Sequence, residues 1–175
     1  MVDKPRPAQA GPRRRLETLF ETENGPMIRT VVVVGAFLIG ASAVMAQQDI
    51  AVKQDNLMRA QGKSMYVVIL KMTKGEIPYD QKAIDAAIAQ LAESVPTIPS
   101  VFATNPKEDV VNATYGSSQK IWQNKADFDS KITPVAKAIA DVKGKIKDVA
   151  SLKVAYDSIQ DKCTDCHETY RLKLK

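Results

Sequence analysis

Apolar residues recur every three or four positions in four stretches of the chain, at residues 47–74, 80–95, 118–144 and 148–170. This spacing places them on one face of an α-helix, with polar side chains on the other faces. Four amphipathic helices with two short connections and one long one predict an all-α fold, an antiparallel four-helix bundle. The stripes consist of Ile50, Leu57, Met58, Met65, Val68, Ile69 and Met72; Ile84, Ala87, Ile88, Leu91 and Val95; Ile121, Trp122, Phe128, Ile132, Val135, Ile139 and Val142; and Val149, Leu152, Tyr156, Ile159, Cys163, Cys166 and Tyr170.

Glycine, proline and capping residues mark most of the helix ends. The first helix should stop near Gly75, and Gly144 should end the third. Asp80 and Asp148 are suited to cap the second and fourth helices, because a carboxylate can accept a hydrogen bond from the first backbone N–H groups. Pro96 should end the second helix, since proline cannot donate to the preceding turn.

The third helix and the segment before it are interrupted by prolines. Residues 96–118 are rich in proline, glycine and serine, and they predict a long connection with few regular elements. Ser117 or Ser118 can cap the third helix. Pro134 lies inside the third stripe, so a kink is expected there.

The fourth stretch contains both cysteines and the only histidine of the sequence, in the order Cys163-Thr164-Asp165-Cys166-His167. This pattern is typical of covalent haem attachment. Two thiols three positions apart can lie on one helix face, each adding to one haem vinyl group, and the adjacent imidazole can ligate the iron. The expected cofactor is one haem c per chain, linked through both cysteines. The two cysteines share the apolar stripe, so the haem should face the bundle interior.

Other uses of two nearby cysteines fit the sequence less well. A thioredoxin-like pair follows a strand in a βαβ pattern, which this chain lacks. A zinc site would have three ligands, with no further cysteine or histidine for a fourth. A disulfide between residues three apart on a helix has poor geometry.

Residues 1–46 have the pattern of an N-terminal extension and a secretory signal peptide. Basic residues precede a short apolar run at 31–39, and small residues lead to a cleavage site after Ala46. Met27 is a plausible start for an ordinary signal. The alternative is an uncleaved membrane anchor, at the short limit for a span. Cleavage would leave residues 47–175 as the folded domain, and export agrees with haem attachment outside the bacterial cytoplasm.

Composition supports the helical interpretation and excludes one class of partner. Hydrophobic residues make up 45% of the chain but aromatic residues only 6%, which suits helices better than sheets. The formal net charge is +5. The basic residues are dispersed along the chain, with no aromatic stacking platform among them. The sequence therefore does not predict a nucleic-acid-binding protein.

Three segments give the chain a resemblance to the class II c-type cytochromes, the family of cytochrome c′. They are residues 163–171 (CTDCHETYR), residues 74–80 (KGEIPYD) and residues 121–128 (IWQNKADF). The haem motif near the C-terminus points to class II, because class I proteins carry it near the N-terminus. The resemblance covers residues 47–175, and it implies a single haem in a four-helix bundle.

The resemblance separates two subgroups by what faces the iron. Cytochrome c′ proper leaves the iron five-coordinate beneath an apolar side chain of the first helix, whereas the low-spin c-556 type supplies a methionine as the sixth ligand. Here Met58 falls at that place, and Gln54 replaces an arginine usual in cytochrome c′. The c-556 type is also the closer match at residues 47–49, 56–58 and 144–148. Met58 is therefore the expected sixth ligand; the alternative is an ordinary core methionine. Met65 is the reserve candidate, expected to contact another part of the bundle.

Smaller expectations concern three further residues. By resemblance, Arg171 lies beside the proximal imidazole of His167; the alternative is a solvated cation at the helix end. Trp122 is a candidate for packing against the haem or for the core. Tyr170 is expected to be a core residue.

The function expected from these features is electron transfer in the periplasm, without enzyme activity. Redox partners should bind transiently, and by analogy a homodimer could form through the first two helices; membrane association is expected only if the signal segment stays uncleaved. The alternative is a five-coordinate, cytochrome c′-like binder of nitric oxide or carbon monoxide. Peroxidase-like catalysis lacks support, because no second histidine exists to act as an acid–base group.

Overall fold

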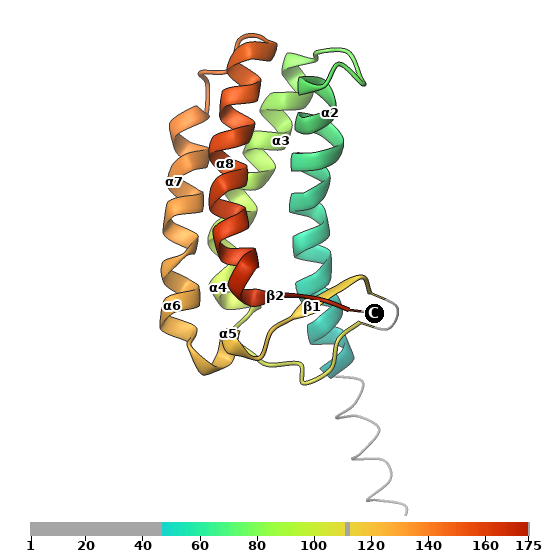
Figure 1. Ribbon diagram of the computed structural model, residues 1–175, viewed down its shortest axis with the longest axis vertical. Helices are drawn as coiled ribbons and strands as arrows, with labels where there is room; N and C mark the ends of the chain where they lie inside the picture. The colour runs from blue at the N-terminus through green and yellow to red at the C-terminus, as the bar shows by residue number, and fades with distance from the viewer. Residues whose placement is uncertain (1–46, 111–112, 175) are drawn as a thin grey trace, which may run out of the picture. The chain divides into compact units, whose positions relative to one another are not determined.

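The computed structural model describes residues 47–110 and 113–174. The expected signal peptide lies outside these residues. Its cleavage point after Ala46, which is also the expected domain boundary, lies at their edge. The described chain forms an antiparallel four-helix bundle, as Figure 1 shows. The predicted fold class is confirmed. Within the described residues, no helix combines the length and the apolar character needed to cross a membrane.

The first three helices of the bundle are divided into segments, whereas the fourth is continuous. The bounds are, in chain order, residues 47–62, η1 (Lys63–Leu70, a π-helix) and α2 (Lys71–Thr73) for the first helix; α3 (Gln81–Ser94), η2 (Val95–Thr97) and α4 (Ile98–Val101) for the second; β1 (Tyr115–Ser117); α5 (Lys120–Gln123), α6 (Lys125–Ser130) and α7 (Ile132–Val142) for the third; α8 (Val149–Tyr170) for the fourth; and β2 (Arg171–Lys173).

The first helix ends where the sequence predicts. Gly75 has a φ of 70°, the left-handed conformation that glycine adopts without steric cost. The Gly75 N–H donates to the Met72 carbonyl (3.1 Å), and the Glu76 N–H donates to the Lys71 carbonyl (2.9 Å). These two bonds form a Schellman motif, which satisfies carbonyl groups left free at the helix end.

The predicted N-caps of the second and fourth helices are confirmed. The Asp80 carboxylate accepts a hydrogen bond from the Ala83 N–H (3.1 Å). Asp148 accepts one from the Ser151 N–H (2.7 Å), and the Ser151 hydroxyl oxygen accepts one in return from the Asp148 N–H. The result is a capping box that fixes the start of the helix bearing the haem motif.

The third helix is interrupted twice, once in the turn before Pro134, as predicted, and once at a place that the sequence did not predict. Its breaks lie at Asn124, where φ is −134° and ψ is 58°, and at Lys131, which separates α6 from α7. Pro134 is the third residue of α7, so the break at Lys131 falls in the turn before this proline, where the disruption was expected. The first N–H groups of a helix have no intrahelical acceptor, so proline in the first turn costs no hydrogen bond.

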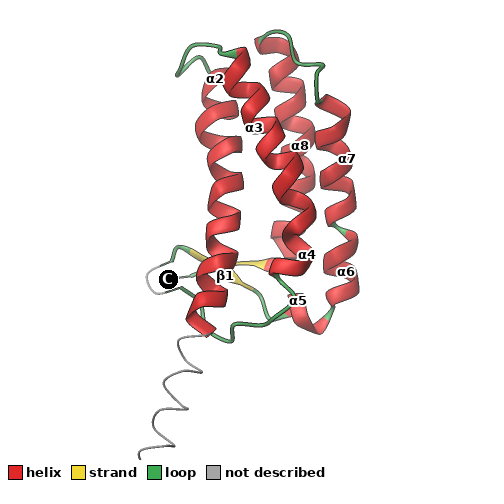
Figure 2. Cartoon of the chain, turned by 180° about the vertical axis from the view of Figure 1, so that it is seen from behind, coloured by secondary structure: helices red, strands yellow, loops and turns green. Residues whose placement is uncertain are grey.

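The connection over residues 96–118 contains more regular structure than predicted. Pro96 and Pro99 lie in the first turns of η2 and α4, where proline is compatible with a helix. β1 then pairs antiparallel with β2, which follows α8 directly. Figure 2 shows α4, α5 and β1 together at one end of the bundle. At Gly116 of β1, a Cβ would overlap the Asp109 carboxylate, so a larger residue there would require the Asp109 side chain to move.

Exchanging Gly75 tests how strongly its conformation fixes the turn after the first helix. Gly75→Ala should lower the free energy of unfolding by about 1 kcal/mol, because a Cβ disfavours the left-handed region. Gly75→Asn should cost less, since asparagine tolerates this conformation. Urea unfolding of both variants measures the difference. Equal losses for alanine and asparagine would contradict the conformational explanation.

Candidate functional site

The bundle encloses a cavity of about 400 Å³ at the end that carries the β1–β2 ribbon. The first helix, the segments α5 to α7 and α8 line it. The end of α3, the segments η2 and α4, residues within 102–110 and 114–117, and the start of β2 contribute as well. The apolar side chains that line it include Leu91, Val95, Ile98, Phe102, Ile121, Phe128, Ile132, Val135, Ile139 and Ile159.

All three chemically active residues of the haem motif line this cavity. Cys163 is half-buried, Cys166 is buried, and neither forms a disulfide. Burial raises the pKa of both thiols to about 11, so both are protonated at neutral pH. A thioredoxin-like pair would need a lowered pKa, which argues against that alternative.

His167 is in the form that a metal ligand requires. Burial and the nearby Arg171 guanidinium lower the pKa of His167 to about 4. The imidazole is therefore neutral at pH 7 and keeps a nitrogen lone pair for iron. Among the described residues, no group of three or more His, Cys, Asp or Glu side chains gathers into a metal site, so the zinc alternative gains no support.

Two methionines of the first helix face the same cavity. Met58 is half-buried and lines the cavity from the first helix. Met65 is only 3% exposed and lines it too. Met65 also belongs to the hydrophobic core, and it lies on the same face as Met58 because seven residues bring a helix back to nearly the same direction.

Of the three remaining candidate residues from the sequence, two line the cavity and one does not. Arg171 lines the cavity and lies over the Tyr115 ring, with its Cζ atom 4.5 Å from the ring centroid. Tyr170 lines the cavity as a buried residue, and its hydroxyl donates to Asp127. Trp122 does not line the cavity: it packs against the core, and its indole N–H donates to the Phe102 carbonyl (3.0 Å). This bond turns the indole toward the α4 end.

The donor set and the shape together fit a covalent haem. A largely apolar cavity suits a flat apolar ring, two thiols and a neutral imidazole come from one helix, and thioether sulfurs come from another. The family model described as Cytochrome C′ matches residues 49–171. The chain belongs to the cytochrome c′ family.

The relatives of this cytochrome include both subgroups. It is 70% identical to cytochrome c-555 of Bradyrhizobium diazoefficiens over 85% of this chain and 100% of that protein. It is 46% identical to cytochrome c-556 of Rhodopseudomonas palustris, covering 84% of this chain and 99% of that one. An NMR-validated structural model of the oxidised R. palustris cytochrome c556 matches with 41% identity and a TM-score of 0.61, over 73% of this chain and 99% of that chain. Cytochrome c′ of R. palustris matches with 29% identity and a TM-score of 0.63, over 73% and 98%.

Family membership establishes the general function. The cytochrome carries covalent haem c and transfers electrons, and it is not an enzyme. The bound haem supplies one-electron exchange at its iron. The chain supplies the attachment, the ligands and an apolar enclosure.

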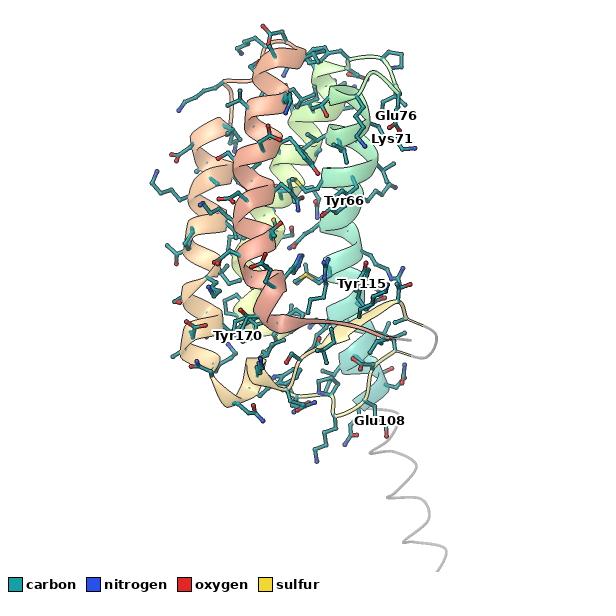
Figure 3. All side chains as sticks on the ribbon, in the orientation of Figure 1. Tyr66, Lys71, Glu76, Glu108, Tyr115 and Tyr170 are labelled. Carbon is teal, nitrogen blue, oxygen red and sulfur yellow. The ribbon has the colours of Figure 1, made fainter. Side chains whose placement is uncertain are left out.

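One polar residue, Gln54, is buried in the wall of the site. Gln54 is 3% exposed and lines the cavity. Its amide nitrogen donates to the carbonyls of Val101 (3.2 Å) and Thr104 (3.0 Å), while its Oε1 has no partner among the described residues. The sequence signals were a polar residue within the first apolar stripe and the replacement of an arginine that is usual in cytochrome c′. Figure 3 shows two further contributors, Tyr66 on the first helix and Tyr115 of β1, and both line the cavity.

Proposed function

We propose that this cytochrome is a periplasmic one-electron carrier with haem c attached through Cys163 and Cys166 and iron ligated by His167 and Met58. The observation that carries the proposal is the presence of Met58 in the same cavity as the three motif residues. Ligation by histidine and thioether keeps the iron six-coordinate in both oxidation states, so little rearranges on electron transfer. The thioether also raises the reduction potential.

The relatives support Met58 over an open iron. Those at 70% and 46% identity are cytochromes c-555 and c-556, whereas the cytochrome c′ of R. palustris is only 28% identical. The c-556 resemblance of residues 56–58 leads to the same ligand. Met65 is the competing methionine, because it also lines the cavity.

The chain's own residues have separable tasks in this proposal. His167 stays neutral through burial and the adjacent Arg171, so it offers a lone pair at the pH of the periplasm. The apolar lining excludes water from the ring, which favours a high potential. Trp122, outside the lining, would act on the haem only through the core.

Localisation and partners follow from the same proposal. The signal-like segment before residue 47 and the covalent haem both agree with the periplasm. Encounters with redox partners should be weak and transient, and any homodimer should form through the first two helices. Membrane association requires that the signal segment be retained.

The absorption spectrum of the reduced holoprotein, with and without carbon monoxide, tests the proposal. Narrow low-spin bands that do not change with the gas are expected, because a strong ligand closes the iron on both sides. A broad high-spin spectrum that shifts with carbon monoxide would favour the five-coordinate gas binder. Absence of haem bands after expression with a competent maturation system would refute the haem site itself.

A further inference from the structure

The cavity that would hold the haem contains few groups suited to its two propionate carboxylates. These carboxylates need cations or N–H donors, because burying an unpaired anion is costly. Most of the lining is apolar, and its carboxylates, Asp55 and Asp109, would repel an anion. The lining has two cationic side chains, Arg59 and Arg171. His167 also lines the cavity, but it is neutral at pH 7.

The amide donors in the lining are already engaged elsewhere. Gln54 directs its amide nitrogen to two backbone carbonyls, which leaves only an acceptor oxygen. Gln61 donates to the Ser94 hydroxyl (3.2 Å), and Gln160 donates to the Thr164 hydroxyl (3.0 Å). These bonds already use part of the amides' donor capacity, whereas a guanidinium offers a positive charge together with several N–H groups, so the cations of the lining suit the carboxylates better.

The exposed members of the lining mark the mouth of the cavity. Tyr66 and Tyr115 are 42% and 47% exposed and come from the first helix and from β1. Arg59 is also exposed, and its helix position follows Met58 directly. Arg171 stacks over Tyr115, so its position is fixed by the ribbon. Arg59 is the cation at this mouth that comes from the same helix as the proposed iron ligand.

Arg59 is oriented by a neighbour one turn earlier. Its Nε–H donates to Asp55, whose side chain is 22% exposed against 63% for Arg59. A guanidinium has five N–H groups in a planar fork, and one edge can hold a carboxylate while another edge stays available. Asp55 therefore fixes Arg59 without exhausting its donors.

We propose that Arg59, positioned by Asp55, binds a haem propionate at the mouth of the cavity. The inference rests on the proposed haem site and adds the cation that anchors the haem's polar edge. It also makes Arg59 a determinant of the reduction potential, because a nearby positive charge disfavours the oxidised, more positive haem.

The experiment compares Arg59→Gln and Arg59→Lys holoproteins with the wild type and with Lys137→Gln. Lys137 is a matched control: it forms an exposed (i,i+4) pair with Asp141 on α7 but does not line the cavity. Midpoint potentials come from optical redox titration, and the propionate bending vibration comes from resonance Raman spectroscopy. Haem content and low-spin bands are recorded for every variant.

Arg59→Gln should lower the midpoint potential, with a roughly three- to tenfold change in the oxidised-to-reduced ratio, or about 30–60 mV for a one-electron couple. The propionate vibration should shift as well. Arg59→Lys should recover most of the potential but not the vibration, since an ammonium lacks the planar fork. Lys137→Gln should change neither quantity.

Two outcomes separate this inference from the proposed function. A low-spin wild type whose potential and propionate vibration are unchanged in Arg59→Gln would overturn the inference and leave the electron carrier intact. A wild type without low-spin haem would remove the proposed function first. If Arg59→Gln yields no folded protein, Arg59→Lys still decides, because an unshifted propionate vibration in that variant contradicts guanidinium binding.

Discussion

Met58→Leu should convert the cytochrome from a closed, low-spin form to an open, high-spin form that binds carbon monoxide. Leucine has a similar volume but no sulfur, so the substitution removes the proposed ligand while keeping the cavity filled. The broadened spectrum of the reduced protein and its change on adding the gas measure the effect. The midpoint potential should fall, because the thioether that favours ferrous iron is lost.

Met65→Leu is the matched control, because Met65 lines the same cavity from the same helix and is more deeply buried. This variant should remain low-spin and ignore carbon monoxide. Its stability should change by less than about 1.5 kcal/mol, as is usual for exchanges that conserve volume. The reverse pattern, with Met65→Leu opening the iron and Met58→Leu silent, would transfer the ligand role to Met65.

The sequence predicted those features that depend on local chemistry. Helical periodicity located the four helices, and the carboxylates of Asp80 and Asp148 located two of their starts. Gly75 located one of the ends. The haem motif was predictable for the same reason, since its cysteines repeat the period of the apolar stripe on α8 and therefore face the interior.

The features that the sequence did not predict depend on tertiary contacts. Strands of three residues, such as β1 and β2, have no detectable period, and only their pairing with each other defines them. Trp122 fits the apolar stripe of the third helix, but the Phe102 carbonyl determines where its indole points. Gln54 appears as a polar interruption until Val101 and Thr104 provide its acceptors. Periodicity gives a direction for each side chain but not its partner.

Protein produced without haem should be far less stable than the holoprotein and should have lost fixed side-chain packing. A cavity of 400 Å³ that stayed open and dry would cost about 10 kcal/mol at about 24 cal/mol per Å³, so the haem-free chain must collapse around it or admit water. This cost is comparable to the whole stability of a typical domain, about 5–15 kcal/mol. We therefore expect retained far-UV but weakened near-UV circular dichroism, together with exposed apolar surface that binds a hydrophobic dye. Urea unfolding should show a broad transition.

A variant with one attachment point separates cavity filling from covalent linkage. Cys163→Ala should keep the haem through the remaining thioether at Cys166, so the cavity stays filled and unfolding should remain cooperative. Its loss of stability should be much smaller than that of the haem-free chain. If the haem-free chain instead unfolds cooperatively within about 2 kcal/mol of the holoprotein, the helices must close the cavity by themselves, because an open one of this volume would cost several times more. The apolar residues of the first helix, α7 and α8 would then specify the bundle, and the haem would add chemistry to a fold that is already stable.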